Sequence, residues 1–132
     1  VFGKCCTYVV EQQFSFKIFG RGRAKTHQQN TMAMRIMQHL MTYLYLRYPR
    51  AVTVEFRAYY KTQVIGCPKE RNTDSKRKTW SKNLFMEILE DREETATLEF
   101  LSKYKAKKSD MADTYLQLQA FKYLVFVDGT FS

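Results

Sequence analysis

The stretch NTMAMRIMQHLMTYLYLRYP, residues 30 to 49, decides the fold class of this chain. Its apolar residues recur at helical spacing until Pro49 stops the pattern. Asn30 or Thr31 supplies a polar residue of the kind that caps the N-terminus of a helix. We therefore expect a helix over residues 30 to 48.

Two β-rich runs flank this helix. CTYVV, residues 6 to 10, predicts a strand with Glu11 at or just beyond its C-terminal end, and VTVEFRAYY, residues 52 to 60, predicts the next strand. A full helix between two strands favours a parallel pair, so the chain is expected to belong to the α/β class. Two or three strands rarely form a stable sheet alone, which suggests that further strands lie outside these residues.

The rest of the chain predicts more helices and two basic segments. We expect a basic, loop-like segment over residues 14 to 29 and a turn over 65 to 68, and a second basic segment, 69 to 82, runs into a helix. A short helix is expected over 97 to 104, and a last helix over about 110 to 125 with Ser109 as its cap. The 132 residues suffice for one domain, 1–132.

The charge is unevenly distributed. The net charge is +9, yet six of the 13 acidic residues fall between Glu87 and Glu99, where Arg92 is the one basic residue. The other 119 residues hold 21 basic and seven acidic side chains. Such an excess predicts a polyanionic partner, nucleic acid before an anionic membrane surface.

Membrane, secretory and disulfide classes are not indicated. No apolar run approaches the roughly 18 residues of a membrane-spanning helix, and the start VFGKCC lacks the features of a signal peptide. We therefore expect an intracellular protein that does not bind membranes. Cys5, Cys6 and Cys67 have no disulfide or zinc-site spacing, so we expect all three to be reduced.

Two aspartates in KKSDMADTYLQLQ, residues 107 to 119, are candidates for chemistry. Asp110 and Asp113 lie three residues apart, so on a helix they share one face, which also carries apolar residues. In the first turn they could simply complement the helix dipole. With Glu11 at a strand end, however, the three carboxylates could hold two Mg²⁺ ions about 4 Å apart, as in phosphoryl-transfer sites.

Five motifs in order carry a resemblance to a family: YVVEQQ (8 to 13), the helix 30 to 49, AVTVEF (51 to 56), KRKTWSK (76 to 82) and KKSDMADTYLQ (107 to 117). Together they resemble the RuvC-type Holliday junction resolvases, in the poxvirus and fungal mitochondrial branch. The resemblance implies an RNase H-like fold with a mixed sheet flanked by helices. It also implies a homodimeric, Mg²⁺-dependent endonuclease that resolves four-way DNA junctions by paired nicks.

The resemblance assigns roles to individual residues. Glu11, Asp110 and Asp113 match the family's metal-binding carboxylates and would be catalytic, with two Mg²⁺ ions that Mn²⁺ can replace. The helix over residues 30 to 48 would contribute to the dimer contact. From the resemblance we expect a viral replication site in the host cytoplasm, or a mitochondrion, as the location. The basic residues expected to contact DNA are Lys17, Arg21, Arg23, Lys25, Lys76, Arg77, Lys78, Lys82, Lys107 and Lys108.

One family feature is absent from the sequence. The family's first strand carries a further metal-binding aspartate, and nothing before Val1 supplies it. We expect the first strands to lie on a missing N-terminal piece, in the same or another chain. The alternatives are a catalytically incomplete relative that only binds or assembles on nucleic acid, and a rearranged chain in which Asp128 takes that place. A related nuclease that cuts RNA·DNA hybrids is a weaker alternative.

Overall fold

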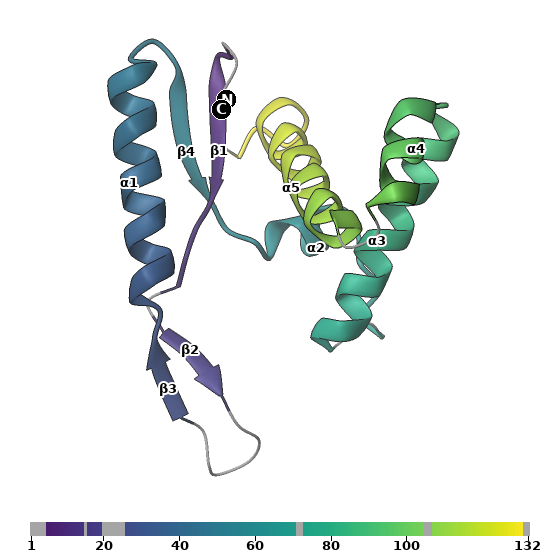
Figure 1. Cartoon of the computed structure of the whole chain (residues 1–132), viewed down its shortest axis with the longest axis horizontal. Helices are drawn as coiled ribbons and strands as arrows, with labels where there is room; N and C mark the ends of the chain where they lie inside the picture. Colours follow the sequence, from purple (N-terminus) through teal and green to yellow (C-terminus); the bar gives the residue numbers. More distant parts are fainter. Residues whose placement is uncertain (1–4, 15, 20–25, 71–72, 105–106, 131–132) are drawn as a thin grey trace. The chain divides into compact units, whose positions relative to one another are not determined.

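The computed structural model describes residues 5–14, 16–19, 26–70, 73–104 and 107–130 (Figure 1). The chain divides into two compact units, 1–57 and 58–132. Among the described residues, no helix is long and apolar enough to cross a membrane. The expected single domain over 1–132 stays a prediction.

The first unit is built on a parallel strand pair. Strand β1 (Thr7–Glu11) pairs with strand β4 (Val52–Phe56) so that Thr7 lies opposite Val52 and Glu11 opposite Phe56. Helix α1 (Thr31–Arg47) connects them and contacts both strands. This arrangement confirms the predicted α/β class, the parallel pair and the long helix.

Helix α1 is anchored through its ends and its inner face. Asn30 is the N-cap residue, but its side-chain amide donates to the carbonyl oxygen of Phe14 at 3.1 Å instead of capping the helix. Met37 and Leu44 are its buried residues, and Phe56 at the end of β4 is buried as well. The core of this unit therefore lies between α1 and the strand pair.

The basic segment over residues 14 to 29, expected to be a loop, contains a hairpin. Strand β2 (Phe16–Phe19) pairs antiparallel with β3 (Thr26–Gln29), and Phe16 lies opposite Gln29. The prediction was wrong because glycines and basic residues between the strands masked the short β-rich run FKIF. Backbone pairing of two short strands does not require a long apolar pattern.

The second expected strand is shorter than predicted. Strand β4 ends at Phe56, and helix α2 (Tyr60–Val64) takes the last residue of the predicted strand together with residues 61 to 64, to which no element was assigned. The aromatic and β-branched residues there favoured a strand. Packing of α2 against the last helix overrides that preference. Gly66, with φ +86°, forms the expected turn just after α2.

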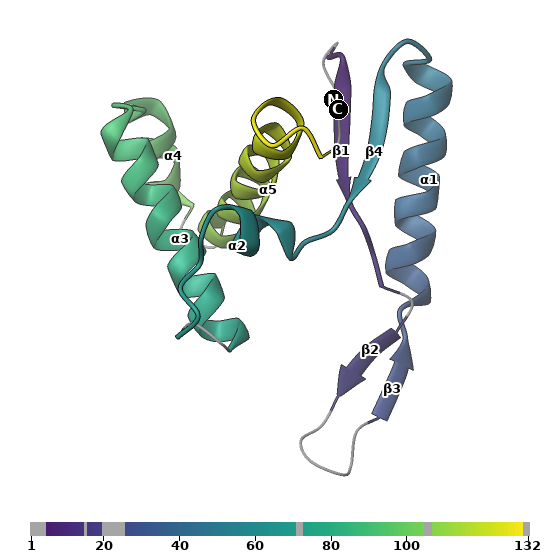
Figure 2. The same ribbon diagram turned by 180° about the vertical axis from the view of Figure 1, so that it is seen from behind.

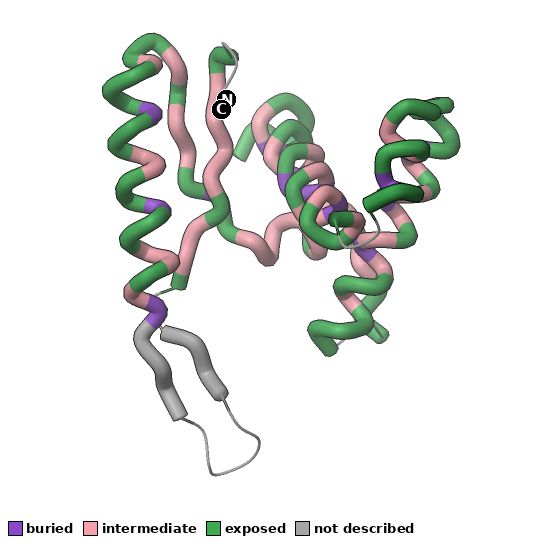
Figure 3. Tube along the Cα trace, viewed as in Figure 1, coloured by how far each residue is buried: buried purple, intermediate pink, exposed green. Residues whose placement is uncertain are grey.

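The second unit is a cluster of four helices. Helices α2 and α3 (Asp74–Asp91) pack on α5 (Lys108–Phe126), and α4 (Thr95–Lys103) packs on α3 (Figure 2). Phe85, Leu89, Leu101 and Ala112 form its buried core. Buried positions recur along α5, which is therefore the central helix of this unit (Figure 3).

The last helix begins earlier than expected. Its N-cap position is Lys107, which makes no side-chain capping bond, and Ser109 lies inside the first turn. The predicted Ser109 cap was wrong, because the bond from the Lys107 amide to the Tyr104 carbonyl (2.9 Å) turns the chain into the helix two residues sooner. Of the two aspartates, only Asp110 therefore lies in the first turn; the expectation that Asp113 does too was also wrong.

Candidate functional site

Glu11 lies where the sequence predicted it. It is the last residue of β1, at the carboxyl end of a parallel strand, and its side chain is exposed. The next residue, Gln12, continues the contact with β4, since its amide donates to the Phe56 carbonyl at 2.9 Å. Its side-chain oxygen accepts from Arg57 at 3.2 Å. Glu11 therefore projects from the strand end, the position where open α/β sheets place functional groups.

Asp113 is paired with a residue that the sequence analysis missed. Lys61 of α2 places its ammonium 2.9 Å from Oδ1 of Asp113. The side chains are 15% and 33% exposed, so the pair lies partly inside the second unit. The pattern-based prediction could not find Lys61, because it assigned residue 60 to a strand and 61 to no helix.

Asp110 has different surroundings. It is exposed and borders a hollow of about 480 Å³ that α3, α4 and α5 line with Phe85, Leu89 and Tyr115 among others. Glu94 lies on the same rim. The two aspartates share one helix but have different neighbours. Those of Asp110 are mainly apolar and include the acid Glu94, whereas Asp113 is paired with the cation Lys61.

The three predicted carboxylates are divided between the two units. Glu11 is in the first unit and the aspartates are in the second, so their expected meeting stays a prediction. Within the described part of the chain, no three His, Cys, Asp or Glu side chains are grouped as metal ligands. By chemistry the donor set fits Mg²⁺, which prefers carboxylate oxygens. An ion at Asp113 would have to share or replace the ammonium of Lys61.

The predicted DNA-binding residues of α3 lie in its first turns. Lys78 and Lys82 line a hollow of about 350 Å³ together with Ser109 of α5, which brings the two helix starts together. Asp74 lines the same hollow, and Arg77 forms an ion pair with it. Lys78 and Lys82 are therefore the cations of α3 that line this hollow, next to the start of α5.

The remaining predicted cations are described only in part. Lys107 and Lys108 stand at the start of α5, the first exposed and the second half-buried. Arg21, Arg23 and Lys25 lie outside the described residues, and Lys17 belongs to β2 without a described side chain. The hollow thus lies between the starts of α3 and α5, each of which carries predicted cations, and those of the hairpin stay predictions.

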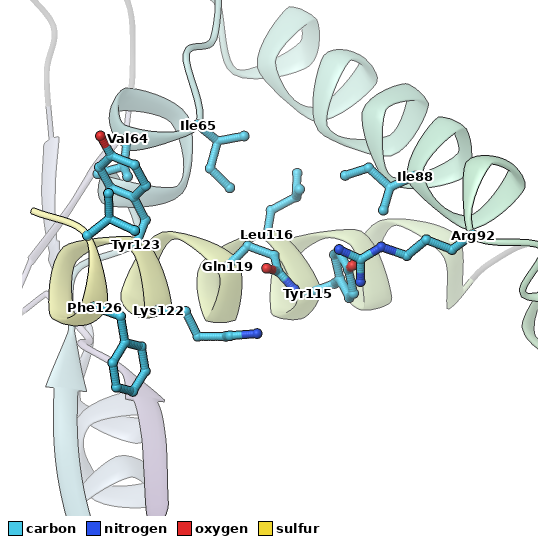
Figure 4. A pocket seen from close by; sticks show the side chains of 11 residues that line it. Val64, Ile65, Ile88, Arg92, Tyr115, Leu116, Gln119, Lys122, Tyr123 and Phe126 are labelled. Carbon is cyan, nitrogen blue, oxygen red and sulfur yellow. The ribbon is translucent and has the colours of Figure 1, made fainter.

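A third hollow, a groove, runs along α5 and faces α2 and α3. It measures about 460 Å³, and we call it the α3–α5 groove. Figure 4 shows Arg92, Gln119 and Lys122 among its apolar and aromatic side chains. Its lining residues are Val64, Ile65, Ile88, Arg92, Tyr115, Leu116, Gln119, Lys122, Tyr123, Phe126 and Val127. None of these residues was predicted to be functional from the sequence.

Helix α1 carries an exposed apolar stripe. Met32, Ile36, Tyr43 and Leu46 are all exposed, Ile36 at 60% and Leu46 at 78%. Their spacings of four, seven and three residues match the positions that form the seam between two helices. The buried Met37 and Leu44 lie on another face, toward the strands. We call these four residues the α1 stripe.

Comparison with known proteins finds two viral relatives. The chain is 33% identical over 141 residues to "Uncharacterized protein 170L" of Invertebrate iridescent virus 6, an alignment covering 92% of this chain and 52% of that protein. It is 27% identical over 121 residues to "Uncharacterized protein 97L" of Invertebrate iridescent virus 3, covering 90% and 49%. The chain therefore spans about half the length of the curated relatives it matches.

Two further comparisons bear on the family. No protein-family model matches the chain, and no solved structure matches it. The viral source of both relatives agrees with the viral origin that the resemblance led us to expect.

Proposed function

We propose that this chain is part of a Mg²⁺-dependent, structure-specific endonuclease with an RNase H-like fold, which resolves four-way DNA junctions by paired nicks. The observation that carries the proposal is Glu11, exposed at the carboxyl end of a parallel strand that a helix connects to its neighbour. The aspartate pair on α5 supports it, because oxygen ligands are what Mg²⁺ takes in phosphoryl transfer.

In this proposal Glu11, Asp110 and Asp113 hold the metal, which when bound activates water and stabilises charge on the phosphate. A fourth carboxylate is required from another segment or another chain. Lys61 orients the Asp113 carboxylate until an ion replaces it. Lys78, Lys82, Lys107 and Lys108 hold the DNA backbone beside the start of α5.

A four-way junction has two strands to nick, which requires two active sites at a defined spacing. A second copy of this chain supplies the other site, docked through the α1 stripe. The stripe supports this part of the proposal because its exposed apolar residues follow the seam spacing of paired helices. Arg35 and Arg47 flank it, so the dimer would present additional positive charge next to the seam.

The test is nicking of a synthetic four-way junction in Mg²⁺ by the wild type, Asp113→Asn and the matched control Glu99→Gln. Glu99 is an exposed acid of α4 that pairs with Lys103, so its loss removes equal charge away from α5. Symmetric nicks lost only in Asp113→Asn support the resolvase. Duplex DNA and an RNA·DNA hybrid serve as competitors, and preference for the hybrid would replace the resolvase with a hybrid-cutting nuclease.

A second candidate function is a binding or assembly subunit without catalysis. The Lys61 ion pair favours it, because an ammonium already neutralises one of the proposed metal ligands. Tight, salt-sensitive junction binding without nicking, unchanged by Asp113→Asn, would identify this role. The same experiment thus separates the two candidates.

A further inference from the structure

The α3–α5 groove combines an apolar lining with positive charge. Its apolar floor comes from Ile88 and Leu116, and Tyr123, Phe126 and Val127 add exposed apolar surface. Phe126 is 78% exposed although it lies on the central helix of the unit. A volume of about 460 Å³ lies within the range of small-molecule sites, roughly 300 to 1,000 Å³.

The charge in the groove has one sign. Arg92 and Lys122 border it, and no acidic side chain lines it among the described residues. Neither cation forms an ion pair with a described acid. The guanidinium of Arg92 lies over the ring of Tyr115, 6.0 Å from its centroid, at the edge of the groove (Figure 4).

The groove also offers hydrogen-bonding atoms that suit a heterocycle. The amide of Gln119 stands between Arg92 and Lys122, as Figure 4 shows, and it can both donate and accept. Aromatic side chains bind bases by stacking, which tolerates any sequence, and nearby cations bind the adjoining phosphates. An apolar peptide helix would use the floor, but it would leave two cations and an amide without partners.

The geometry points to the α3–α5 groove as a binding site for an unpaired nucleotide of single-stranded DNA. The base lies on the apolar floor against Phe126, with its polar edge at Gln119. Lys122 and Arg92 bind the flanking phosphates. This goes beyond the proposed function, because it assigns a base-binding site to residues that hold no metal and perform no cleavage.

The experiment measures binding of a single-stranded tetranucleotide with 2-aminopurine at its second position, followed by the fluorescence of that base at low salt. A tetranucleotide with an abasic second position, added as competitor, presents the same phosphates without the base. The variants are Phe126→Ala and Lys122→Gln, both at exposed positions, so far-UV circular dichroism should remain that of the wild type. Matched controls are Tyr104→Ala and Lys103→Gln, an exposed aromatic and an exposed cation beside each other at the C-terminal end of α4.

We expect Phe126→Ala to weaken binding about tenfold, the lower range for loss of one base-stacking contact. Lys122→Gln should weaken it severalfold and lower the salt dependence. Both controls should bind like the wild type, and the abasic competitor should compete at least tenfold less well, by the same stacking contribution. Asp113→Asn should bind equally, so a failure of the cleavage proposal leaves this result unaffected.

Three results would overturn the inference. Equal competition by the abasic tetranucleotide means that phosphates alone are bound. Equal losses in Lys103→Gln and Lys122→Gln mean that general charge, not the groove, attracts DNA. Wild-type affinity in Phe126→Ala leaves the groove to some other occupant, such as an apolar protein segment.

Discussion

The ammonium of Lys61 lies 2.9 Å from Oδ1 of Asp113 and thereby joins α2 to α5 in the second unit. Because both side chains are partly buried, this ion pair should contribute more to the free energy of unfolding than an exposed ion pair does. In a double-mutant cycle with Lys61→Met and Asp113→Asn, we expect a coupling free energy of about 1 kcal/mol, the upper end for partly exposed pairs. Urea unfolding followed by circular dichroism measures it.

The matched control for this cycle is the exposed pair Lys103 and Glu99, whose ammonium and carboxylate are 2.8 Å apart on α4. Its coupling should be no more than about 0.5 kcal/mol, typical of exposed pairs one helical turn apart. Equal coupling in the two cycles would show that enclosure of Lys61 adds nothing.

The same pair predicts competition between Lys61 and a divalent ion. If Asp113 holds a metal, removing the ammonium in Lys61→Met should tighten Mn²⁺ binding about fivefold or more, as for two ligands that compete for one site. Lys61→Arg, which keeps the charge, should bind Mn²⁺ like the wild type. Electron paramagnetic resonance of free Mn²⁺ reports the affinity without requiring nicking.

Two results oppose this expectation in different ways. Equal Mn²⁺ affinity in the wild type and Lys61→Met would remove the competition while leaving a metal site in place. No Mn²⁺ binding in any variant would instead remove the metal from the proposed function of this chain.

Much of the fold follows from local pattern. The helix over 30 to 48 was predictable because its apolar residues recur at helical spacing over a long segment that Pro49 ends. The position of Glu11 was predictable because it follows a short β-rich run. Helix α2 was not predictable from the local pattern, because Tyr59 and Tyr60 favour a strand, whereas in the structure α2 packs against α5. Local preference is weak over five residues, and tertiary contacts then decide.

The candidate site shows the same limit. Asp110 and Asp113 could be found from their spacing, because a helix fixes which residues share a face. Their neighbours could not be found, since Lys61 is 52 positions before Asp113 and no periodicity links the two. The start of α5 was also misplaced, because Ser109 is a good cap by type, whereas the turn from Tyr104 to Lys107 sets where the helix begins.

The basic hollow predicts a salt-dependent contribution to DNA binding. Replacing both Lys78 and Lys82 by Gln removes two cations beside Ser109, so the slope of log affinity against log salt should fall by about 1 to 2. The double variant Arg50→Gln with Lys103→Gln removes equal charge at two exposed positions elsewhere and should change the slope less on junction DNA. Filter binding at four salt concentrations measures both. Equal slopes would exclude a special role for the α3 start.

Tyr8 predicts how the first unit responds to alkali. Desolvation in the half-buried strand, and then a hydrogen bond with Cys5, raise the pKa of Tyr8 to about 12. The folded pKa is above the ordinary value of 10.0, so the folded state keeps a proton that the unfolded chain loses. The resulting stability is present below about pH 10 and is lost as pH rises toward about 12.

Tyr8→Phe should therefore lose less stability than the wild type over that alkaline range, because the phenylalanine has no proton to lose. Urea unfolding at pH 9 and at about pH 11 measures the difference, and comparison of the two proteins cancels the lysines that titrate there. Tyr123→Phe changes an exposed tyrosine and is the control. Parallel losses in all three proteins would contradict the raised pKa of Tyr8.

The α1 stripe predicts a dimer that one charge disrupts. Ile36 is 60% exposed at the middle of the stripe, so Ile36→Glu places a carboxylate against its symmetry mate at the seam and should leave only monomers. Gln38→Glu adds the same charge two residues away, off the stripe, and should remain dimeric. Sedimentation equilibrium gives the mass of each. Because neither residue is buried, both variants should fold, and a monomeric wild type would remove the second active site that paired nicking requires.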